Sequence, residues 1–197
     1  MTHAFSAQSA NANKIVLGGS SGAFFTGYIK DLRLWNKAIS GTEIEYFMRQ
    51  SPRFDQEGLA MLFQLNEGEG TQLEEHVSNT LFAASSVQWS TPDEDILLCP
   101  NPTVLDTSSG CCIPSITVPL KNGGEYGIEL PENTVTNFVT TYTIEFWLYV
   151  PSLPATSSVI LSKTPGISIS VSPDGTLTFI AHSDANTFTS SFIQTSK

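Results

Sequence analysis

Cysteine, histidine and basic residues are scarce in this chain of 197 residues, which has three cysteines, three histidines and nine lysines and arginines together. Cys99, Cys111 and Cys112 form no Cys-x-x-Cys pair and have no nearby histidine, so the pattern does not predict a zinc site. Adjacent Cys111 and Cys112 rarely bridge each other, because the geometry is strained. A disulfide between Cys99 and one of them is the candidate pairing, and it leaves one thiol free or paired with another chain.

Positive charge and long apolar runs are scarce as well. The formal net charge of −10 argues against a nucleic-acid partner, because phosphates would be repelled, and it is compatible with calcium, a cationic partner or simple solubility. No run of about 18 apolar residues occurs, so the sequence predicts no membrane insertion. Residues 1–17 have no apolar signal-peptide region, so in a secreted protein Met1 would be an artificial start or an internal residue of a longer chain.

Hydrophobic residues, by contrast, make up 40% of the chain and charged residues only 14%, which predicts a packed core rather than disorder. The strongest β pattern runs from Tyr142 to Val150, where apolar residues alternate with Glu145, Trp147 and Tyr149. Residues 172–175 have the composition of a hairpin turn. These patterns predict antiparallel strands.

A second β segment runs from Phe25 to Trp35. Its alternation is regular over Ile29–Asp31 and again over Leu32–Leu34, which predicts a bulge near Asp31. Ser40 or Thr42 can cap a helix near residues 41–49, because a hydroxyl satisfies a free N–H group at a helix start. The sequence therefore predicts an all-β fold with one short helix.

The composition changes between residues 90 and 118, where proline and serine are frequent and all three cysteines lie. Such a stretch is typical of a linker, so a domain boundary is predicted there. It separates residues 1–89 from residues 119–197.

Three groups of motifs in this chain resemble laminin-G-like domains of the concanavalin A-like superfamily. Phe25-Thr26-Gly27, Ile29, Asp31 and the run from Arg33 to Ser40 resemble the closing strand and the start of the helix that follows. Residues 58–71, with G-L-x-x-x-F-x-L and E-G-x-G-T, resemble a segment that follows this helix in tandem arrays. Residues 142–179, with Y-T-I-E-F-W-L-Y-V, I-L-S-K and G-I-x-I-x-V-x-x-D-G-T-L-T-F, resemble the early strands. The resemblance implies an antiparallel jelly-roll sandwich.

The order of these motifs is unusual, because late strands precede early strands. It implies that residues 1–89 are the C-terminal part of one laminin-G-like sandwich and that residues 119–197 are the N-terminal part of a second. The chain is then a fragment of a tandem array. Two other interpretations stay open: a single circularly permuted sandwich with fewer strands, or half-domains that neighbouring chains complete by strand addition.

Two acidic features are candidate metal sites. The closing-strand aspartate of this superfamily often binds a structural calcium, so the resemblance implies a Ca2+ role for Asp31, although calcium needs several more oxygen ligands. The alternative is an exposed residue that pairs with Lys30 or Arg33. The second feature is an acidic cluster, which is more typical of a solvated turn than of a metal site; its members are Glu67, Glu69, Glu74 and Glu75.

Catalysis is not predicted. Related glycosidases carry a Glu-x-Asp-x-x-Glu strand, and this chain has no match to it, so Glu145 stands alone and cannot be both acid and nucleophile. Trp147 and Tyr149 could instead stack on sugar rings while Glu145 accepts hydrogen bonds. The alternative is that a second sheet or a neighbouring domain covers this face. Trp35 and Trp89 are expected in the core.

The resemblance implies a non-catalytic adhesion or recognition module of a large extracellular or cell-surface protein, with a glycan, a protein or a neighbouring domain as its partner. The alternative is a structural assembly unit whose half-sandwiches are completed by neighbouring chains. An accessory domain of a carbohydrate-active enzyme is the least favoured hypothesis, because the carboxylate pair is missing.

Overall fold

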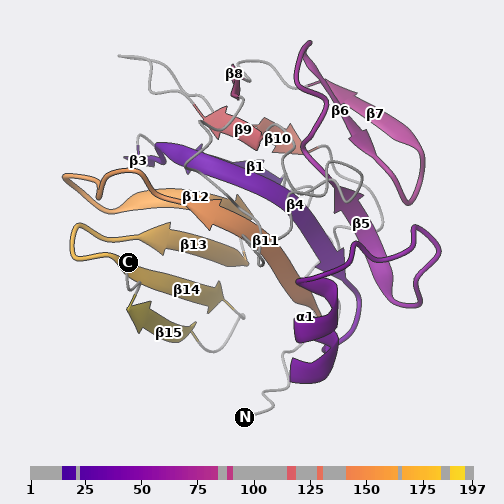
Figure 1. Cartoon of the computed structure of the whole chain (residues 1–197). Coiled ribbons are helices and arrows are strands. Elements are labelled where there is room, and N and C mark those ends of the chain that lie inside the picture. Colours follow the sequence, from indigo (N-terminus) through magenta and orange to yellow (C-terminus); the bar gives the residue numbers. More distant parts are fainter. Residues whose placement is uncertain are drawn as a thin grey trace.

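The structure is a computed structural model that describes residues 15–20, 23–83, 88–90, 115–118, 128–130, 141–163, 166–182 and 187–193. These residues form strands and one short helix, so the prediction of an all-β fold with a single helix is confirmed for them (Figure 1). The elements are β1 (Ile15–Leu17), β2 (Gly19–Ser20), β3 (Ala23–Phe24), β4 (Gly27–Trp35), α1 (Gly41–Phe47), β5 (Leu59–Phe63), β6 (Gln72–Glu75), β7 (Thr80–Ala83), β8 (Gln88–Ser90), β9 (Ser115–Val118), β10 (Ile128–Leu130), β11 (Thr143–Tyr149), β12 (Ser158–Lys163), β13 (Ile167–Val171), β14 (Thr176–His182) and β15 (Thr187–Ile193).

The strands form two larger sheets and one hairpin. The first sheet has the order β10-β1-β12-β13-β14-β15, and β2 and β3 join it beside β12. The second sheet has the order β11-β4-β9-β8. In it, β5 and β9 pair with opposite ends of β4, on the side away from β11. The hairpin is β6-β7, and all neighbours are antiparallel except β3 and β12.

Strands from the two predicted halves of the chain pair with one another in both larger sheets. In the first sheet, β1 lies between β10 and β12. In the second, β4 pairs with β11 over most of its length. Of the predicted linker at residues 90–118, the structure describes only Ser90, which ends β8, and strand β9. Cys99, Cys111 and Cys112 lie outside the described residues. The assignment of the halves to two domains therefore stays a prediction.

A bulge interrupts β4 at the predicted position. Glu145 of β11 lies opposite Arg33, but Trp147 lies opposite Lys30, so β4 has one residue more than β11 in this interval. Asp31 has a φ of 57°, in the left-handed region that an aspartate can adopt at such a bulge. The predicted bulge is confirmed.

The bulge decides which side chains of β4 enter the core. Ile29, Leu32 and Leu34 are at most 1% exposed and belong to one apolar cluster, to which both larger sheets and the β6-β7 hairpin contribute. A strand with strict alternation could not place all three on one face. Asp31 and Arg33 lie on the opposite face, where α1 packs.

Helix α1 is held by its start and by one aromatic contact. Ser40 is the N-cap, and its side chain and that of Glu43 form a reciprocal capping box. Phe47, the only buried residue of the helix, stacks on the fully buried Trp35 with ring centroids 5.0 Å apart. Because both residues join a second apolar cluster with Leu59 and Leu62, the helix covers one end of the second sheet.

Glu75 is a buried carboxylate that fixes the β6-β7 hairpin to β5. It is 1% exposed, and it accepts hydrogen bonds from the backbone N–H groups of Leu62, Val77 and Ser78 at 2.7–2.9 Å and from the Ser78 hydroxyl. For Glu75, the interpretation of the acidic cluster as a solvated turn is therefore wrong. Glu69 of the same cluster is exposed.

We expect Gly27→Ala to lower the free energy of unfolding by about 2 kcal/mol, because the new methyl group would overlap its neighbours. An added Cβ would lie 2.2 Å from Cζ of Phe25 and 2.5 Å from the carbonyl oxygen of Tyr149. The matched control is Gly41→Ala in the first turn of α1, where an added Cβ would meet no heavy atom within 4 Å apart from its chain neighbours and the backbone of its own helix. Urea unfolding measures both variants, and equal midpoints for them would contradict the prediction.

We expect Glu75→Gln to lower the free energy of unfolding by about 2 kcal/mol, because the new NH2 group faces donors and leaves at least one of them unsatisfied. Glu69→Gln, in the exposed part of the same acidic cluster, should change it by less than about 0.5 kcal/mol. Guanidinium unfolding of the two variants tests this. An equal decrease in the free energy of unfolding of both variants would show that the buried hydrogen bonds of Glu75 do not contribute to stability.

Candidate functional site

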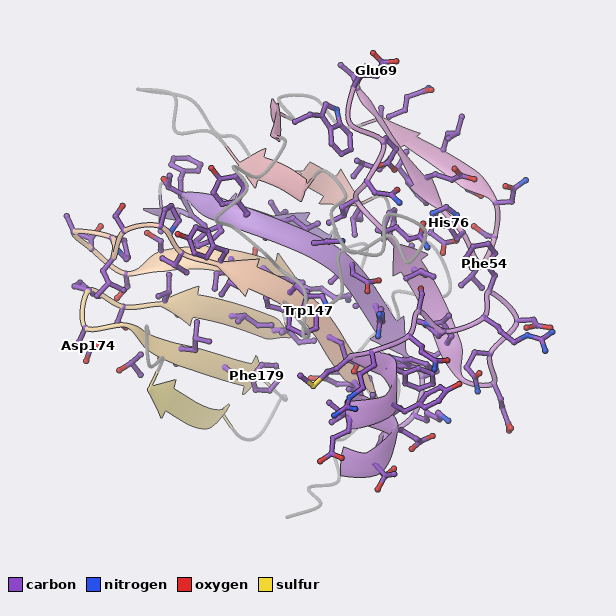
Figure 2. The ribbon with its side chains drawn as sticks, in the orientation of Figure 1. Phe54, Glu69, His76, Trp147, Asp174 and Phe179 are labelled. Carbon is purple, nitrogen blue, oxygen red and sulfur yellow. The ribbon has the colours of Figure 1, made fainter. Side chains whose placement is uncertain are left out.

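The candidate site is a groove of about 340 Å³ between strand β11 and helix α1, which we term the edge groove. Residues 143–147 of β11 line it, together with Asp31 and Arg33 of β4. Ile44 of α1 and Met48, the C-cap residue of that helix, complete the lining. Trp147, labelled in Figure 2, stands above α1 in that view. Consecutive residues of β11 alternate between two faces, so a groove that all five line lies along the edge of the strand.

β11 is an edge strand among the described strands. It pairs with β4 on one side, and no described strand pairs with it on the other. An edge strand presents backbone N–H and C=O groups that can pair with an added strand. The edge groove therefore combines backbone hydrogen-bonding groups with side chains from both faces of β11.

Arg33 positions helix α1 as one wall of the groove. Arg33 is only 4% exposed. Its Nε donates a hydrogen bond of 3.1 Å to Oδ1 of Asp31, and its Nη2 donates to Oδ2 of the same carboxylate. Nη1 donates to the carbonyl oxygen of Phe47 at 2.8 Å, at the C-terminal end of α1. A cation is favourable at this end of a helix, where carbonyl groups lack intrahelical partners. The arginine thus ties the bulge of β4 to the last turn of the helix.

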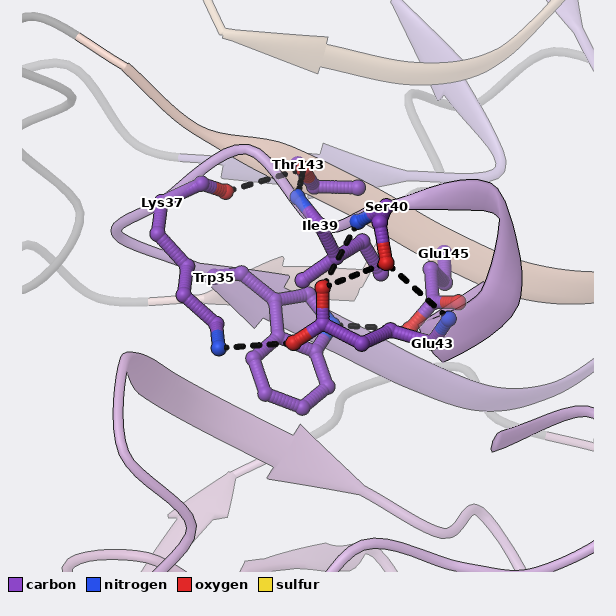
Figure 3. Close-up of polar contacts among 7 residues, drawn as sticks. All are labelled: Trp35, Lys37, Ile39, Ser40, Glu43, Thr143 and Glu145. Atoms are coloured by element: carbon purple, nitrogen blue, oxygen red, sulfur yellow. Dashed lines mark hydrogen bonds and ion pairs between the residues drawn. The ribbon is translucent and has the colours of Figure 1, made fainter. Parts of the chain in front are cut away.

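A second set of hydrogen bonds fixes the start of α1 to β11 (Figure 3). The hydroxyl of Thr143 donates to the carbonyl oxygen of Lys37 at 2.9 Å and accepts from the N–H of Ile39 at 3.2 Å. The N–H of Ser40 donates to Glu43, whose carboxylate also pairs with Lys37, and these contacts lower the pKa of Glu43 to about 2. Both ends of the helix are therefore held.

Glu145 is the acidic group of β11 in the groove. Its Oε2 accepts a hydrogen bond of 2.7 Å from Nε1 of Trp35 (Figure 3). The same oxygen lies 3.9 Å from Nη1 of Arg33. Its side chain is 15% exposed. Burial raises the pKa of Glu145 above its usual 4.5, while the hydrogen bond from Trp35 and the charge of Arg33 oppose that rise.

The structure brings together three of the four residues that the sequence predicts for ligand or calcium binding. Glu145, Trp147 and Asp31 line the edge groove. Tyr149 does not, and its ring packs against Tyr28 with centroids 5.7 Å apart. A ligand-binding role for Glu145, Trp147 and Tyr149 stays a prediction.

Three groove residues have roles that sequence reasoning did not identify: Arg33, Ile44 and Met48. The two apolar residues, Ile44 and Met48, are four positions apart at the end of the predicted helix, and this spacing places them on one helix face. Arg33 appeared only as an alternative partner of Asp31, and its contact with the helix could not be seen from sequence.

The candidate calcium ligand Asp31 uses both carboxylate oxygens to bind Arg33. No group of three or more His, Cys, Asp or Glu residues that could hold a metal is found in the part of the chain that the structure describes. The calcium role of Asp31 stays a prediction. Trp35 is fully buried, as predicted, and Trp89 is partly buried against the main cluster.

Comparison with known proteins finds no match: no family model matches the chain, and neither a curated protein nor a solved structure matches it significantly. Among the residues that the structure describes, no helix is both long enough and apolar enough to cross a membrane.

We expect Glu145→Gln to become more stable relative to the wild type as the pH rises from below 4.5 to neutral. The folded-state pKa of Glu145 is raised, so its contribution to stability is complete below its usual pKa of 4.5 and is lost as the pH rises through the folded-state pKa. Glutamine keeps an acceptor for Trp35 without this titration. Urea unfolding of both proteins across this pH range measures the effect, and a difference that stays constant or falls with pH would contradict it.

Proposed function

We propose that the chain is a non-catalytic recognition module of the laminin-G-like, jelly-roll type, and that its edge groove binds an extended segment of a protein partner. The observation that carries this proposal is the meeting of two features in one groove. One is the edge of β11, which no described strand pairs, and the other is the wall that α1 forms beside it. Strand addition at such an edge is a common mode of peptide recognition.

The polar groups of the groove favour a peptide over a glycan. Both oxygens of Asp31 bind Arg33, and the Thr143 hydroxyl both donates and accepts within the chain. Glu145 uses one oxygen to bind Trp35. A sugar needs several hydrogen-bonding groups around it, whereas a peptide strand obtains its hydrogen bonds from the backbone of β11.

The apolar groups of the groove indicate what the segment should contain. Ile44 and Met48 are 37% and 43% exposed, and they lie in the groove with Trp147. Ile144 and Phe146 line it from the core face of β11. Side chains of a strand added beside β11 would alternate between its two faces. One face would meet Ile44, Met48 and Trp147 and the other Ile144 and Phe146, so apolar residues are favoured on both faces of the bound segment.

The pairing within the sheets supports one permuted sandwich rather than two separate partial sandwiches. Strands of residues 1–89 pair with strands of residues 119–197 in both larger sheets, and both sheets contribute to one core. The jelly-roll topology and the extracellular or cell-surface location rest on the motif resemblance.

The test is a selection of short random peptides, displayed on phage, against the immobilised chain. We expect enrichment of peptides with apolar residues on both alternating faces. Trp147→Ala and Met48→Glu should weaken binding of a selected peptide by about tenfold or more, since one buried apolar side chain contributes about 1.5–3 kcal/mol. Tyr46→Ala is the matched control, because Tyr46 lies on the same helix, is 55% exposed and does not line the groove.

Two results would overturn the proposal. One is a selection without enrichment, or with peptides that bind wild type, Trp147→Ala and Met48→Glu equally. The other is binding on a glycan array that Trp147→Ala abolishes, which would assign the groove to sugars.

A further inference from the structure

We infer that the segment bound at the edge groove carries a lysine or an arginine beside Glu145, so that Glu145 decides which apolar segments the groove accepts. This inference rests on the proposed function of the groove and adds one chemical requirement to it. It follows from the balance of charge in the groove, from one carboxylate oxygen of Glu145, and from what a bound strand does to that oxygen.

The lining of the groove carries one negative charge in excess. Its charged residues within the described part of the chain are Asp31, Arg33 and Glu145. Asp31 and Arg33 neutralise each other, because the guanidinium group donates to both oxygens of the carboxylate. At the start of α1, Lys37 and Glu43 also pair with each other. The excess charge therefore belongs to Glu145, and a partner with a positive charge complements the groove.

Glu145 uses only one of its two carboxylate oxygens within the described residues. Oε2 accepts the hydrogen bond from Trp35, and the same oxygen lies 3.9 Å from Nη1 of Arg33. Oε1 has no hydrogen-bond partner among these residues. It is also not one of the buried side-chain atoms that lack a partner there, which are Oε2 of Glu67 and Nε2 of His76. Oε1 is therefore in contact with solvent, where a group of a bound segment can reach it.

A bound strand would remove this oxygen from water. The side chain of Glu145 is only 15% exposed, and the groove beside it is lined by the apolar side chains of Ile44, Met48 and Trp147. An ionised carboxylate that is buried without a partner is unfavourable, whereas a charge-assisted hydrogen bond from lysine or arginine replaces the lost water. A wholly apolar segment must either bind a protonated Glu145 or leave its charge unpaired. A segment with one basic residue avoids both.

The alternation of β11 indicates where the basic residue lies in the segment. Glu145 and Trp147 are two positions apart on one face of the strand, whereas Ile144 and Phe146 pack against the core. If one residue of an added strand lies beside Glu145, the residue two positions away lies beside Trp147. We therefore expect a basic and an apolar residue two positions apart, with apolar residues on the alternate face.

The pKa of Glu145 gives the requirement a pH dependence of defined sign. Burial raises this pKa above 4.5, and the charge of Asp31 adds to the rise, whereas the hydrogen bond from Trp35 and the charge of Arg33 oppose it. A bound cation favours the ionised carboxylate, so binding of a basic segment should weaken as the pH falls from neutral to 4.5. Binding of a wholly apolar segment should strengthen over the same range, because a protonated carboxyl group is easier to bury.

A peptide selection on two forms of the chain tests the inference. Random peptides displayed on phage are selected at neutral pH against the wild type and against Glu145→Gln, which keeps an acceptor for Trp35 but has no charge. We expect lysine or arginine to be enriched in the peptides that bind the wild type and not in those that bind Glu145→Gln. Glu69→Gln is the matched control, because it removes the same charge from an exposed residue outside the groove.

Affinities of one selected peptide then separate a direct contact from general attraction. Replacing its basic residue by methionine keeps an unbranched side chain without the charge. This replacement should weaken binding to the wild type and to Glu69→Gln by about tenfold or more, and binding to Glu145→Gln by less than about threefold. If Glu145→Gln does not fold, the pH dependence of binding to the wild type decides.

The outcomes separate this inference from the proposed function. Peptides that bind the groove without a preference for lysine or arginine, or that bind more tightly as the pH falls, overturn the inference and leave the proposed function standing. A preference that persists in Glu145→Gln, or that Glu69→Gln also loses, assigns it to the overall charge of −10 and overturns the inference as well. A chain that binds no peptide at its groove overturns both.

Discussion

The arrangement around the edge groove depends on the hydrogen bonds of the buried guanidinium group of Arg33. A buried charge is tolerated only when it is paired and hydrogen-bonded, and here Asp31 and the carbonyl group of Phe47 supply the partners. The bulge of β4 makes this possible, because it turns Asp31 to the face of Arg33 while Leu32 stays in the core. One irregular backbone position thereby joins a strand, an ion pair and a helix end. The position of Ile44 and Met48 beside β11 follows from that junction.

We propose a recognition surface for the groove because of the way its side chains are engaged. Its polar side chains are bonded within the chain, Asp31 to Arg33, Glu145 to Trp35 and Thr143 to backbone groups, and they hold the walls in place. This is the role of supporting groups in a preorganised site. The backbone edge of β11 and the apolar side chains are the parts that face a partner. An exposed sheet edge with apolar neighbours is a hazard for a soluble protein unless something pairs with it. The proposed binding of a partner strand would satisfy that requirement.

Local patterns predicted the parts of the fold that local chemistry decides. The bulge at Asp31, the cap at Ser40 and the alternation of β11 were readable because each depends on residues close in sequence. The burial of Glu75 was not readable, because one of its hydrogen-bond donors is the backbone of Leu62, which only the packed fold brings near. The same holds for Tyr149, whose packing partner Tyr28 lies on another strand. Side chains on one strand face were predicted together, but which neighbours cover that face is set by strand pairing across the chain.

The pairing of β1 with β10 and β12, and of β4 with β11, has a consequence for how the chain is made. The hydrogen bond between Trp35 and Glu145 alone spans 110 residues of sequence. Proteins dominated by such distant contacts fold slowly, because the loop must close before the contacts form. During synthesis, β1 leaves the ribosome long before β10 and β12 exist, and β4 leaves it long before β11, although β5, the other long partner of β4, follows soon. Their apolar faces then stay uncovered for the time needed to translate the rest of the chain, and a chaperone that holds nascent strands would have its main task in this interval.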